Sequence, residues 1–302
     1  MILLLGGTGQ LGRAFGDTVR HPPRAQVDLT KPHTIDLALD EYRPEWVINA
    51  AAQHDARGAE RDSRPDFAVN SAGPHMLARA CTKRGIRLLH LSTNYVFGGD
   101  DRDGPFVETD PPAPVTMYGI AKWAGEQAVL TTDPRHIVVR TSCLFGPELR
   151  DGFPGKHVLR GGDPLLAVAD QWVVPTAATD LAQAIQQLIT LDPLMGGVYH
   201  LVGSGGAVTW YDYAMTVLAL TRRHRIVIPT TTDCYGEGVP RPMHSELVNT
   251  RAAALGVEMP AWRTSLERHL SQRGVLDVER HRPHVLHDRD PRAAMGHASS
   301  GP

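Results

Sequence analysis

A tyrosine and a lysine four residues apart are the side chains of this sequence whose types and spacing could do chemistry. They are Tyr118 and Lys122 of the segment YGIAK, and an i, i+4 spacing places both on one face of a helix. A tyrosine normally ionises at about pH 10, and a nearby ammonium lowers that pKa because it favours the phenolate. We expect such a pair to give or take a proton at neutral pH, as the reduction of a carbonyl group requires. Surface helices contain this spacing by chance, so the prediction also depends on a glycine-rich N-terminus and on Ser92-Thr93 after an apolar run.

The glycine-rich turn directly follows an apolar run at the start of the chain. Gly6, Gly9 and Gly12 come after residues 2–5, and helix-compatible residues continue to about residue 19. Glycines allow a tight turn and let the backbone approach a pyrophosphate, while a helix N-terminus offers free N–H groups and the positive end of its dipole. The order strand, turn, helix favours dinucleotide binding over an ordinary glycine-rich turn.

The acidic residue that often binds the cofactor ribose, about 20 residues further on, is not clear in this sequence. The short segment RHPPRA at 20–25 interrupts what should be the second strand. Arg20 or Arg24 could meet a 2′-phosphate, which would favour NADPH over NADH. Plain solvated loop arginines explain the same segment equally well.

Apolar runs alternate with helical patterns through the first half of the chain. The runs at 2–5, 46–51, 87–92 and 137–141 predict buried strands, and helices are predicted over 71–84 and 118–130. This alternation predicts an α/β protein with a doubly wound parallel sheet, the Rossmann type. The proline-rich segment 111–114 can be neither helix nor central strand, so it delivers the chain to the helix that carries Tyr118.

Three parts are expected along the chain. Residues 1–146 form the dinucleotide-binding domain, and residues 147–276 form a smaller substrate-binding lobe with interleaved segments. The second part includes helical patterns at 180–191 and 210–220 and a strand pattern at 198–201. Residues 277–302 are rich in Arg, His, Asp and Pro and are expected to be a disordered tail. We interpret the histidines of the tail as part of a solvated polar segment and not as a metal site.

Composition excludes several classes of protein. The chain has 302 residues, 42% of them hydrophobic, with a net charge of -2 and a pI of about 6.7. This balance argues against a general nucleic-acid surface or an anionic-membrane surface. Three cysteines without a CxxC pattern indicate a reducing compartment. Apolar runs stay below the roughly 18 residues of a membrane span, and residues 1–5 lack the features of a signal peptide, so we expect a soluble cytoplasmic protein.

Several short segments, in this order, carry a family resemblance. They are GGTGQLG (6–12), VINAAAQ (47–53), FAVNSAG (67–73), LSTNYVF (91–97) and MYGIAK (117–122). The set resembles the extended short-chain dehydrogenase/reductases and, more closely, the dTDP-4-dehydrorhamnose reductase family. The resemblance continues through DQ (170–171) with PT (175–176), GVYHL (197–201) with WY (210–211), and RP (241–242) with Ser245 and Leu247. It covers roughly residues 1 to 270.

The resemblance implies a nicotinamide cofactor, NADPH or NADH, and a set of residues that hold it. The implied cofactor-binding residues are Gly9, Gln10 and Leu11 against the pyrophosphate, with Gly6 and Gly12 in the same turn, Asp28 and Leu29 near the adenine, Ala51, Ala52 and Gln53 on the nicotinamide side, and Asn70. Tyr118 and Lys122 also belong to this set. In the implied reaction Thr93 hydrogen-bonds the substrate carbonyl, Tyr118 is the general acid, and Lys122 holds the nicotinamide ribose and tunes Tyr118.

The implied substrate is a dTDP-linked 4-keto-6-deoxy-L-sugar. Its reduction would give dTDP-L-rhamnose or a related antibiotic sugar such as dTDP-dihydrostreptose. Some members of the family use Mg²⁺, but the sequence offers no identifiable ligands for it, and no metal site is predicted. A homodimer is expected at the level of the family, and neither nucleic acid nor membrane is expected as a partner.

Two departures from the family pattern fall on the substrate side. Asn94 stands where the family has aspartate after the threonine, and Cys143 stands where it has tryptophan after Arg-Thr-Ser. With Thr93, these residues form the predicted substrate-binding set. We expect the reduction chemistry to be retained while the sugar differs. Cys143 is interpreted as a small pocket or core residue, because no histidine partner for a nucleophile is evident in the sequence.

Two other functions stay open. One is a non-catalytic dinucleotide-binding subunit, like the regulatory subunit of methionine adenosyltransferase, which the same resemblance reaches. The intact Thr93, Tyr118 and Lys122 disfavour it. The other is a sugar epimerase or dehydratase of the same fold, but Asn94-Tyr95 does not supply the acid and base carboxylates that a dehydratase needs.

Overall fold

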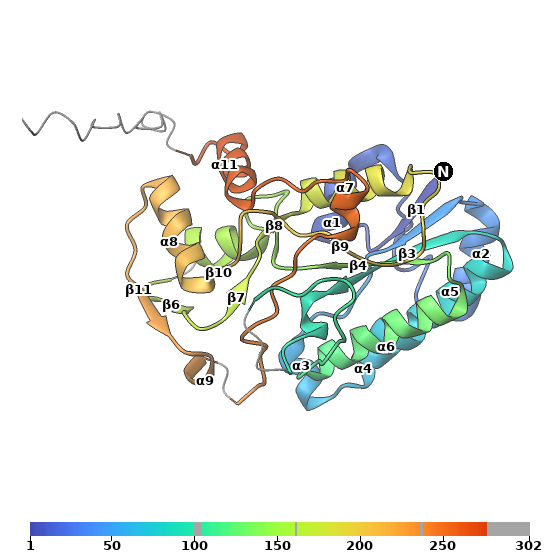
Figure 1. Ribbon diagram of the computed structural model, residues 1–302, viewed down its shortest axis with the longest axis horizontal. Coiled ribbons are helices and arrows are strands. Elements are labelled where there is room, and N and C mark those ends of the chain that lie inside the picture. The colour runs from blue at the N-terminus through green and yellow to red at the C-terminus, as the bar shows by residue number, and fades with distance from the viewer. Residues whose placement is uncertain (100–103, 161, 236–237, 277–302) are drawn as a thin grey trace, which may run out of the picture.

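A five-stranded parallel sheet forms the centre of the computed structural model, which describes residues 1–99, 104–160, 162–235 and 238–276. The strands lie in the order β1 (Ile2–Leu5), β2 (Trp46–Asn49), β3 (Arg87–Thr93), β4 (Ile137–Thr141) and β9 (Gly197–His200). Each neighbouring pair is parallel. The strands predicted at 2–5, 46–51, 87–92 and 137–141 are therefore confirmed (Figure 1). Two of them have the predicted ends, and the other two differ at the C-terminal end by one or two residues.

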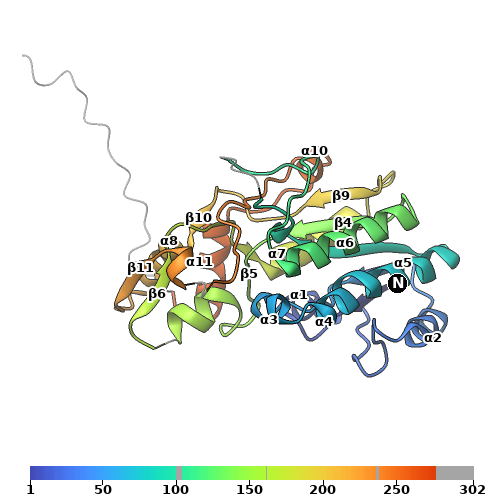
Figure 2. The ribbon, with the colours of Figure 1, turned by 90° about the horizontal axis from the view of Figure 1, so that it is seen from below.

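Helices cover both faces of this sheet (Figures 1 and 2). Leu4, Ile48 and Val139 pack on one face in a core shared with α1 (Gln10–Phe15) and α7 (Ala178–Ile189). On the other face Leu3, Val47 and Val138 pack in a core shared with α2 (Pro32–Tyr42), α5 (Gly73–Lys83) and α6 (Met117–Thr132). Strands buried on both faces have continuous apolar sequences, which is why the runs do not alternate with polar residues. The doubly wound α/β class is confirmed.

The outer edge of β1 holds the segment that was predicted to interrupt a strand. The N–H of Leu4 donates to the carbonyl oxygen of Arg20 at 2.8 Å, and the N–H of Arg20 donates to that of Ile2 at 3.0 Å. On this outer side of β1 the described residues form only this bridge, because Pro22 and Pro23 follow His21 and lack the N–H groups that a strand needs.

Helix α6 is positioned by a cap at its start and by glycines along its length. The Thr116 side chain accepts a hydrogen bond from the N–H of Gly119 at 2.9 Å, as an N-cap should. A Cβ at Gly119 would strike the carbonyl oxygen of Tyr95, and one at Gly125 would strike that of Asn70. Without these side chains α6 lies close to the end of β3 and to the π-helical turn Ala68–Ala72, which leads from α4 (Arg64–Phe67) into α5.

The remaining elements form a smaller lobe at one end of the sheet (Figure 1). Its core gathers Phe145, Val158, Tyr213 and Trp262 around α8 (Trp210–Thr221) and α11 (Trp262–Gln272). Three two-stranded sheets complete it: β5 (Leu144–Phe145) with β8 (Thr176–Ala177), β6 (Leu165–Val168) with β11 (Val227–Thr230), and β7 (Trp172–Val173) with β10 (Val208–Thr209). The short helices α3 (Ala56–Arg61) and α9 (Thr232–Tyr235) contribute no residue to these three cores. The short helix α10 (Arg251–Ala254) contributes Ala252 to the core that α1 and α7 share.

The predicted division of the chain needs one correction. Strand β9 pairs with β4 in the central sheet, and α7 packs on the same face as α1, so both belong to the first domain although they lie beyond residue 146. The reason is that β4 leaves a sheet edge that a fifth strand covers. The predicted tail, 277–302, lies outside the described residues. Within the described ranges no helix is long and apolar enough to cross a membrane.

Candidate active site

The predicted catalytic residues meet at the C-terminal edge of the sheet. Thr93 is the last residue of β3, and Tyr118 lies in the first turn of α6. The Thr93 hydroxyl lies close enough to the Tyr118 hydroxyl to act on the pKa of that phenol. The N–H of Tyr95 also donates to the Thr93 hydroxyl at 3.2 Å, and the Tyr95 ring lies edge-on to Tyr118 with 5.7 Å between centroids. This edge is where open parallel sheets place their ligands.

Burial keeps the Tyr118 phenol protonated. It raises the pKa to about 12, against the opposing influence of the Thr93 hydroxyl, and the nearby Tyr95 and Asp66 add to the rise. The sequence predicts the opposite direction, because an ammonium at Lys122 would favour the phenolate. That prediction is wrong for this structure, since the Lys122 amine makes its hydrogen bonds elsewhere. A phenol that holds its proton at neutral pH can still donate that proton to a carbonyl oxygen.

Lys122 is directed into the sheet. The side chain is 2% exposed, and its Nζ lies 2.6 Å from the carbonyl oxygen of Leu91 and 3.3 Å from Nε2 of His90. Burial lowers the pKa of Lys122 to about 8, and the charge of Glu126 opposes that shift. The amine therefore loses its proton much closer to neutral pH than an exposed lysine does.

A cavity of about 800 Å³ opens beside this edge of the sheet, along the glycine turn. Most of the predicted cofactor residues line it: Gly6, Gly9, Gln10, Leu11, Gly12, Asp28, Leu29, Ala51, Ala52 and Gln53. Leu91 and Leu144 also line it, and along the chain they lie two residues before Thr93 and one residue after Cys143. The lining thus combines the glycine turn with residues that follow β1 and β2, where a doubly wound sheet binds a dinucleotide.

The glycine turn fits a pyrophosphate because a side chain would fill it. A Cβ at Gly6 would lie 2.7 Å from the backbone of Ala50, and Gly6 has a φ of +91°. Gly12 packs directly on the backbone of Gly7. Gly9 differs, since a Cβ there would approach only the Gly6 carbonyl oxygen at 3.3 Å and would otherwise project into open space. Gly9 is thus free for contact with a ligand.

We expect Gly9→Ala to weaken NADPH binding about tenfold, equivalent to ~1.4 kcal/mol. The added methyl group occupies space that the cofactor phosphates need at the start of α1, while the fold has room for it. Fluorescence titration of NADPH, together with a thermal melt, checks both parts. Gly162→Ala is the matched control, because a Cβ there meets nothing within 4 Å. Equal NADPH affinity in Gly9→Ala and wild type would contradict the placement of the pyrophosphate.

The adenine end of the cavity contains the arginine segment. Arg24, His21 and Asp28 all line it. The Asp28 carboxylate accepts hydrogen bonds from the N–H and hydroxyl of Thr30, which lower its pKa. Of the two arginines that the sequence offered for a 2′-phosphate, Arg24 lies in the cavity wall, whereas Arg20 is not among the described lining residues.

Asn70 lies beneath the nicotinamide side of the cavity. It is fully buried. Its Nδ2 donates to the carbonyl oxygen of Gln53 at 2.8 Å, and its Oδ1 accepts from the N–H of the same residue at 3.0 Å. The amide therefore holds the loop after β2 against the π-helical turn, and it contacts the cavity through Gln53 and not directly.

The substrate side contains the two family departures. Asn94 is buried, and its Nδ2 donates to the Ser245 hydroxyl at 2.7 Å. Cys143 follows β4 with a φ of +44°, a left-handed conformation unusual for a residue with a side chain. It packs against the core of the lobe, and burial raises the pKa of its thiol. These observations favour a packing role for Cys143 over a nucleophile.

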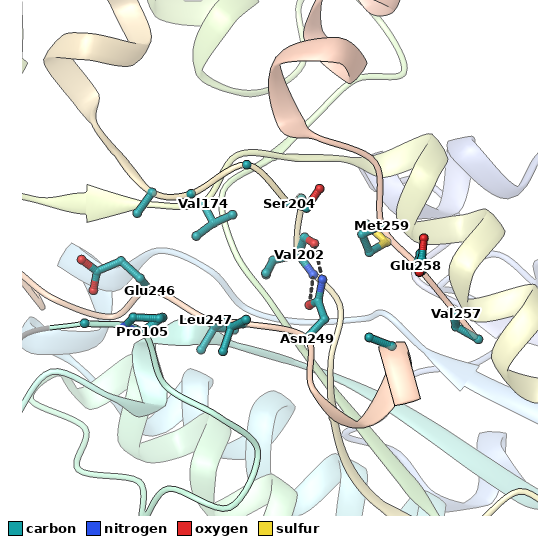
Figure 3. Close-up of a pocket in the computed structure, with 17 residues that line it drawn as sticks. Pro105, Val174, Val202, Ser204, Glu246, Leu247, Asn249, Val257, Glu258 and Met259 are labelled. Carbon is teal, nitrogen blue, oxygen red and sulfur yellow. Dashed lines mark hydrogen bonds between the residues drawn. The ribbon is translucent and has the colours of Figure 1, made fainter. Parts of the chain in front are cut away.

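A second cavity, of about 480 Å³, lies between the loop 203–207 and the segments 246–249 and 257–259 (Figure 3). Asn249 connects two segments of the cavity wall. Its side chain accepts a hydrogen bond from the N–H of Val202 at 2.9 Å and donates one to the Val202 carbonyl oxygen at 2.7 Å. The predicted site residues are not among its described lining residues. We therefore place the chemistry at the glycine-turn cavity. Among the described residues no cluster of three or more His, Cys, Asp or Glu side chains could hold a metal ion.

Sequence reasoning missed the buried polar residues behind the site. His90 and Asn49 are fully buried and hydrogen-bonded to each other, and His90 contacts Lys122. Arg140 and Glu126 form a buried ion pair. A polar residue in the middle of an apolar run, such as His90 in RLLHLS, is the signal that could have found the first group.

Comparisons with known proteins show the family of the chain. The chain matches the family model described as the RmlD substrate binding domain over residues 1–274. It is 36% identical over 276 residues to a Streptomyces antibioticus protein named "Probable dTDP-4,6-dihydroxy-2-methyloxan-3-one 4-ketoreductase", covering 87% of this chain and 92% of that one. It is 35% identical over 279 residues to the dTDP-4-dehydrorhamnose reductase of Streptomyces griseus, covering 87% and 91%. The crystal structure of dTDP-4-dehydrorhamnose reductase from Bacillus anthracis in complex with NADP superposes with a TM-score of 0.82 at 28% identity, covering 90% and 98%.

Proposed function

Because this chain belongs to the family of the RmlD substrate binding domain, we propose that it is an NADPH-dependent reductase of a dTDP-linked 4-keto-6-deoxy-L-sugar. The observation that carries the proposal is the closeness of the Tyr118 and Thr93 hydroxyls at the C-terminal end of β3. Leu91, two residues before Thr93 on the same strand, lines the glycine-turn cavity. The names of the Streptomyces griseus and Bacillus anthracis relatives support the substrate class. The product would be dTDP-L-rhamnose or a related antibiotic sugar such as dTDP-dihydrostreptose.

The chain's share of the reaction is orientation and a proton. NADPH, when bound, supplies a hydride to the ketone carbon. The hydroxyls of Thr93 and Tyr118 donate hydrogen bonds to the carbonyl oxygen, where negative charge develops, and Tyr118 then transfers its proton to complete the alcohol. Its raised pKa ensures that the proton is present at neutral pH. Lys122 lies one turn further along α6, where it would hold the nicotinamide ribose.

NADPH is the proposed cofactor on two grounds. Arg24 contributes a guanidinium to the cavity wall near Asp28, where it would pair with a 2′-phosphate. The Bacillus anthracis relative was crystallised with NADP. The glycines would hold the pyrophosphate, and Ala51, Ala52 and Gln53 would flank the nicotinamide.

Asn94→Asp is expected to raise the preference for dTDP-4-keto-L-rhamnose over a second dTDP-ketosugar about tenfold, equivalent to ~1.4 kcal/mol. An aspartate can only accept hydrogen bonds, so Ser245 would have to donate, and a carboxylate would return to the reacting end of the sugar. The ratio of kcat/KM for the two sugars measures this preference. The KM for NADPH serves as the internal control and should not change. An unaltered ratio would remove Asn94 from the specificity-determining residues.

Product analysis tests the proposed function itself. The purified protein should convert one equivalent of NADPH and one of ketosugar into a sugar with a new carbinol proton, visible by NMR. The position and configuration of that carbinol identify the sugar. Tight NADPH binding without any reduced product would instead favour a non-catalytic dinucleotide-binding subunit.

A further inference from the structure

A buried chain of hydrogen bonds connects the cofactor loop to Lys122. The N–H of Ala51 donates to Oδ1 of Asn49 at 3.2 Å, and Nδ2 of Asn49 lies 3.1 Å from Nδ1 of His90. Nε2 of the same imidazole lies 3.3 Å from Nζ of Lys122. Asn49 and His90 are both 0% exposed. Ala51 lines the cavity, so the chain runs from the cavity wall to a residue of the proposed active site.

The backbone fixes the direction of these bonds. A backbone N–H can only donate, so the Asn49 atom that faces Ala51 is the amide oxygen. The amide nitrogen then faces His90 and donates to Nδ1. A neutral imidazole carries one proton, so the proton of His90 lies on Nε2, toward Lys122. Burial, followed by the charge of Lys122, holds the pKa of His90 well below its usual range, which keeps the ring neutral.

This arrangement opposes an ammonium at Lys122. An Nε2–H group can donate a hydrogen bond to the lone pair of a neutral amine. An ammonium has no lone pair, so its N–H group and the Nε2–H group would face each other as two donors. The carbonyl oxygen of Leu91 accepts one N–H of Lys122 in either state. Lys122 can form a good hydrogen bond to the imidazole as an ammonium only if the ring proton moves to Nδ1 and the Asn49 amide turns over, which breaks the bond to Ala51.

The other titratable groups around Lys122 are paired with another charge, are uncharged, or influence Tyr118. Glu126 lies one turn further along α6 and is paired with Arg140 of β4 at 2.7 Å. On the preceding turn of α6 the Tyr118 phenol is protonated and uncharged. The charge of Asp66 in α4 raises the pKa of that phenol. The π-helical turn contributes Asn70, which is uncharged. His90 is therefore the group on β3 that can shift the equilibrium between the ammonium and the neutral amine of Lys122.

We propose that His90, oriented by Asn49, is a positioning residue that destabilises the ammonium of Lys122 and so makes Lys122 a ready proton donor. The inference rests on the proposed function in one respect. Tyr118 gives a proton to the sugar oxygen, and Lys122 would return one to the phenolate and take one back from solvent. A weaker hold on its proton makes Lys122 a better acid for that step.

The test is an NMR titration of the lysine side chains. The chain has only four lysines, Lys31, Lys83, Lys122 and Lys156, so protein labelled with [ε-¹³C]lysine gives few signals, and Lys122→Arg assigns the one of interest. In the wild type we expect a Lys122 midpoint well below that of the other three. In His90→Gln the midpoint should rise by at least about one pH unit, because the amide oxygen can accept from an ammonium. Asn49→Leu should raise it as well, since the ring proton is then free to move to Nδ1.

The matched control is His136→Gln. His136 is also 0% exposed, and it accepts a hydrogen bond from the N–H of Leu88 at 3.2 Å, but it does not contact Lys122. His136→Gln should leave the titration midpoint of Lys122 unchanged. His90→Gln and Asn49→Leu should each shift the alkaline limb of the pH profile of kcat by as much as they shift that midpoint. An ordinary lysine midpoint in the wild type, or equal midpoints in all variants, would overturn the inference. A shifted midpoint together with no turnover on any dTDP-ketosugar would support the role of His90 and contradict the proposed function.

Discussion

Tyr118→Phe should lose about 10²- to 10⁴-fold in kcat while NADPH affinity stays within about twofold of wild type. The substitution removes only the hydroxyl group that donates the proton, and the ring keeps its edge-on contact with Tyr95. Steady-state turnover at saturating ketosugar measures the loss, and fluorescence titration measures cofactor binding. A change in kcat without a change in cofactor affinity indicates an interaction made in the transition state.

Tyr213→Phe is the matched control for this experiment. The Tyr213 hydroxyl is buried in the core of the lobe and has no hydrogen-bond partner among the described residues. Its removal should leave kcat unchanged. Turnover of Tyr118→Phe within tenfold of wild type would exclude Tyr118 as the general acid.

Glu126→Gln should lower the free energy of unfolding by about 3–5 kcal/mol. Glu126 and Arg140 are 0% and 2% exposed at their side chains, and the guanidinium nitrogens lie 2.7 to 3.2 Å from the carboxylate. The neutral amide would leave the guanidinium buried without a counter-charge, although its carbon atom also lies 5.0 Å from the Phe97 ring centroid. Urea denaturation followed by circular dichroism measures the change.

Two further variants separate charge burial from lost packing. The double substitution Glu126→Gln with Arg140→Met removes both charges and should recover most of the loss. Asp62→Asn breaks the exposed pair with Arg64, whose side chain is 89% exposed, and should change stability by less than about 0.5 kcal/mol. If Glu126→Gln were as mild as Asp62→Asn, the buried pair would not be a main support of α6.

The strands and long helices of the sheet follow from local sequence because each has a continuous signal. A run such as WVIN at β2 must be buried on both faces, and GGTGQLG directly after β1 permits few structures other than a strand-to-helix turn. Strand β9 was predicted as an element but placed in the wrong domain. Its partner, β4, lies about 60 residues earlier, and no local pattern specifies a pairing over that distance.

The cofactor side of the site was predicted more completely than the chemistry behind it. The resemblance gave Gly9, Ala51 and Gln53, and these residues line one cavity. The direction of the Tyr118 pKa was predicted wrongly, because helical spacing alone could not show that Lys122 points toward His90 and Leu91. Burial decides such shifts, and burial is a property of the folded chain. The homodimer and the cytoplasmic location stay predictions.

The most direct test of the central claim is nicotinamide oxidation followed by absorbance. The protein is given NADPH, or NADH in parallel, and dTDP-4-keto-6-deoxyglucose, with and without a 3,5-epimerase that produces the L-sugar. We predict oxidation that depends on the epimerase and is faster with NADPH. Absence of oxidation under both conditions, in protein that binds NADPH normally, would contradict reduction of a dTDP-4-keto-6-deoxy-L-sugar.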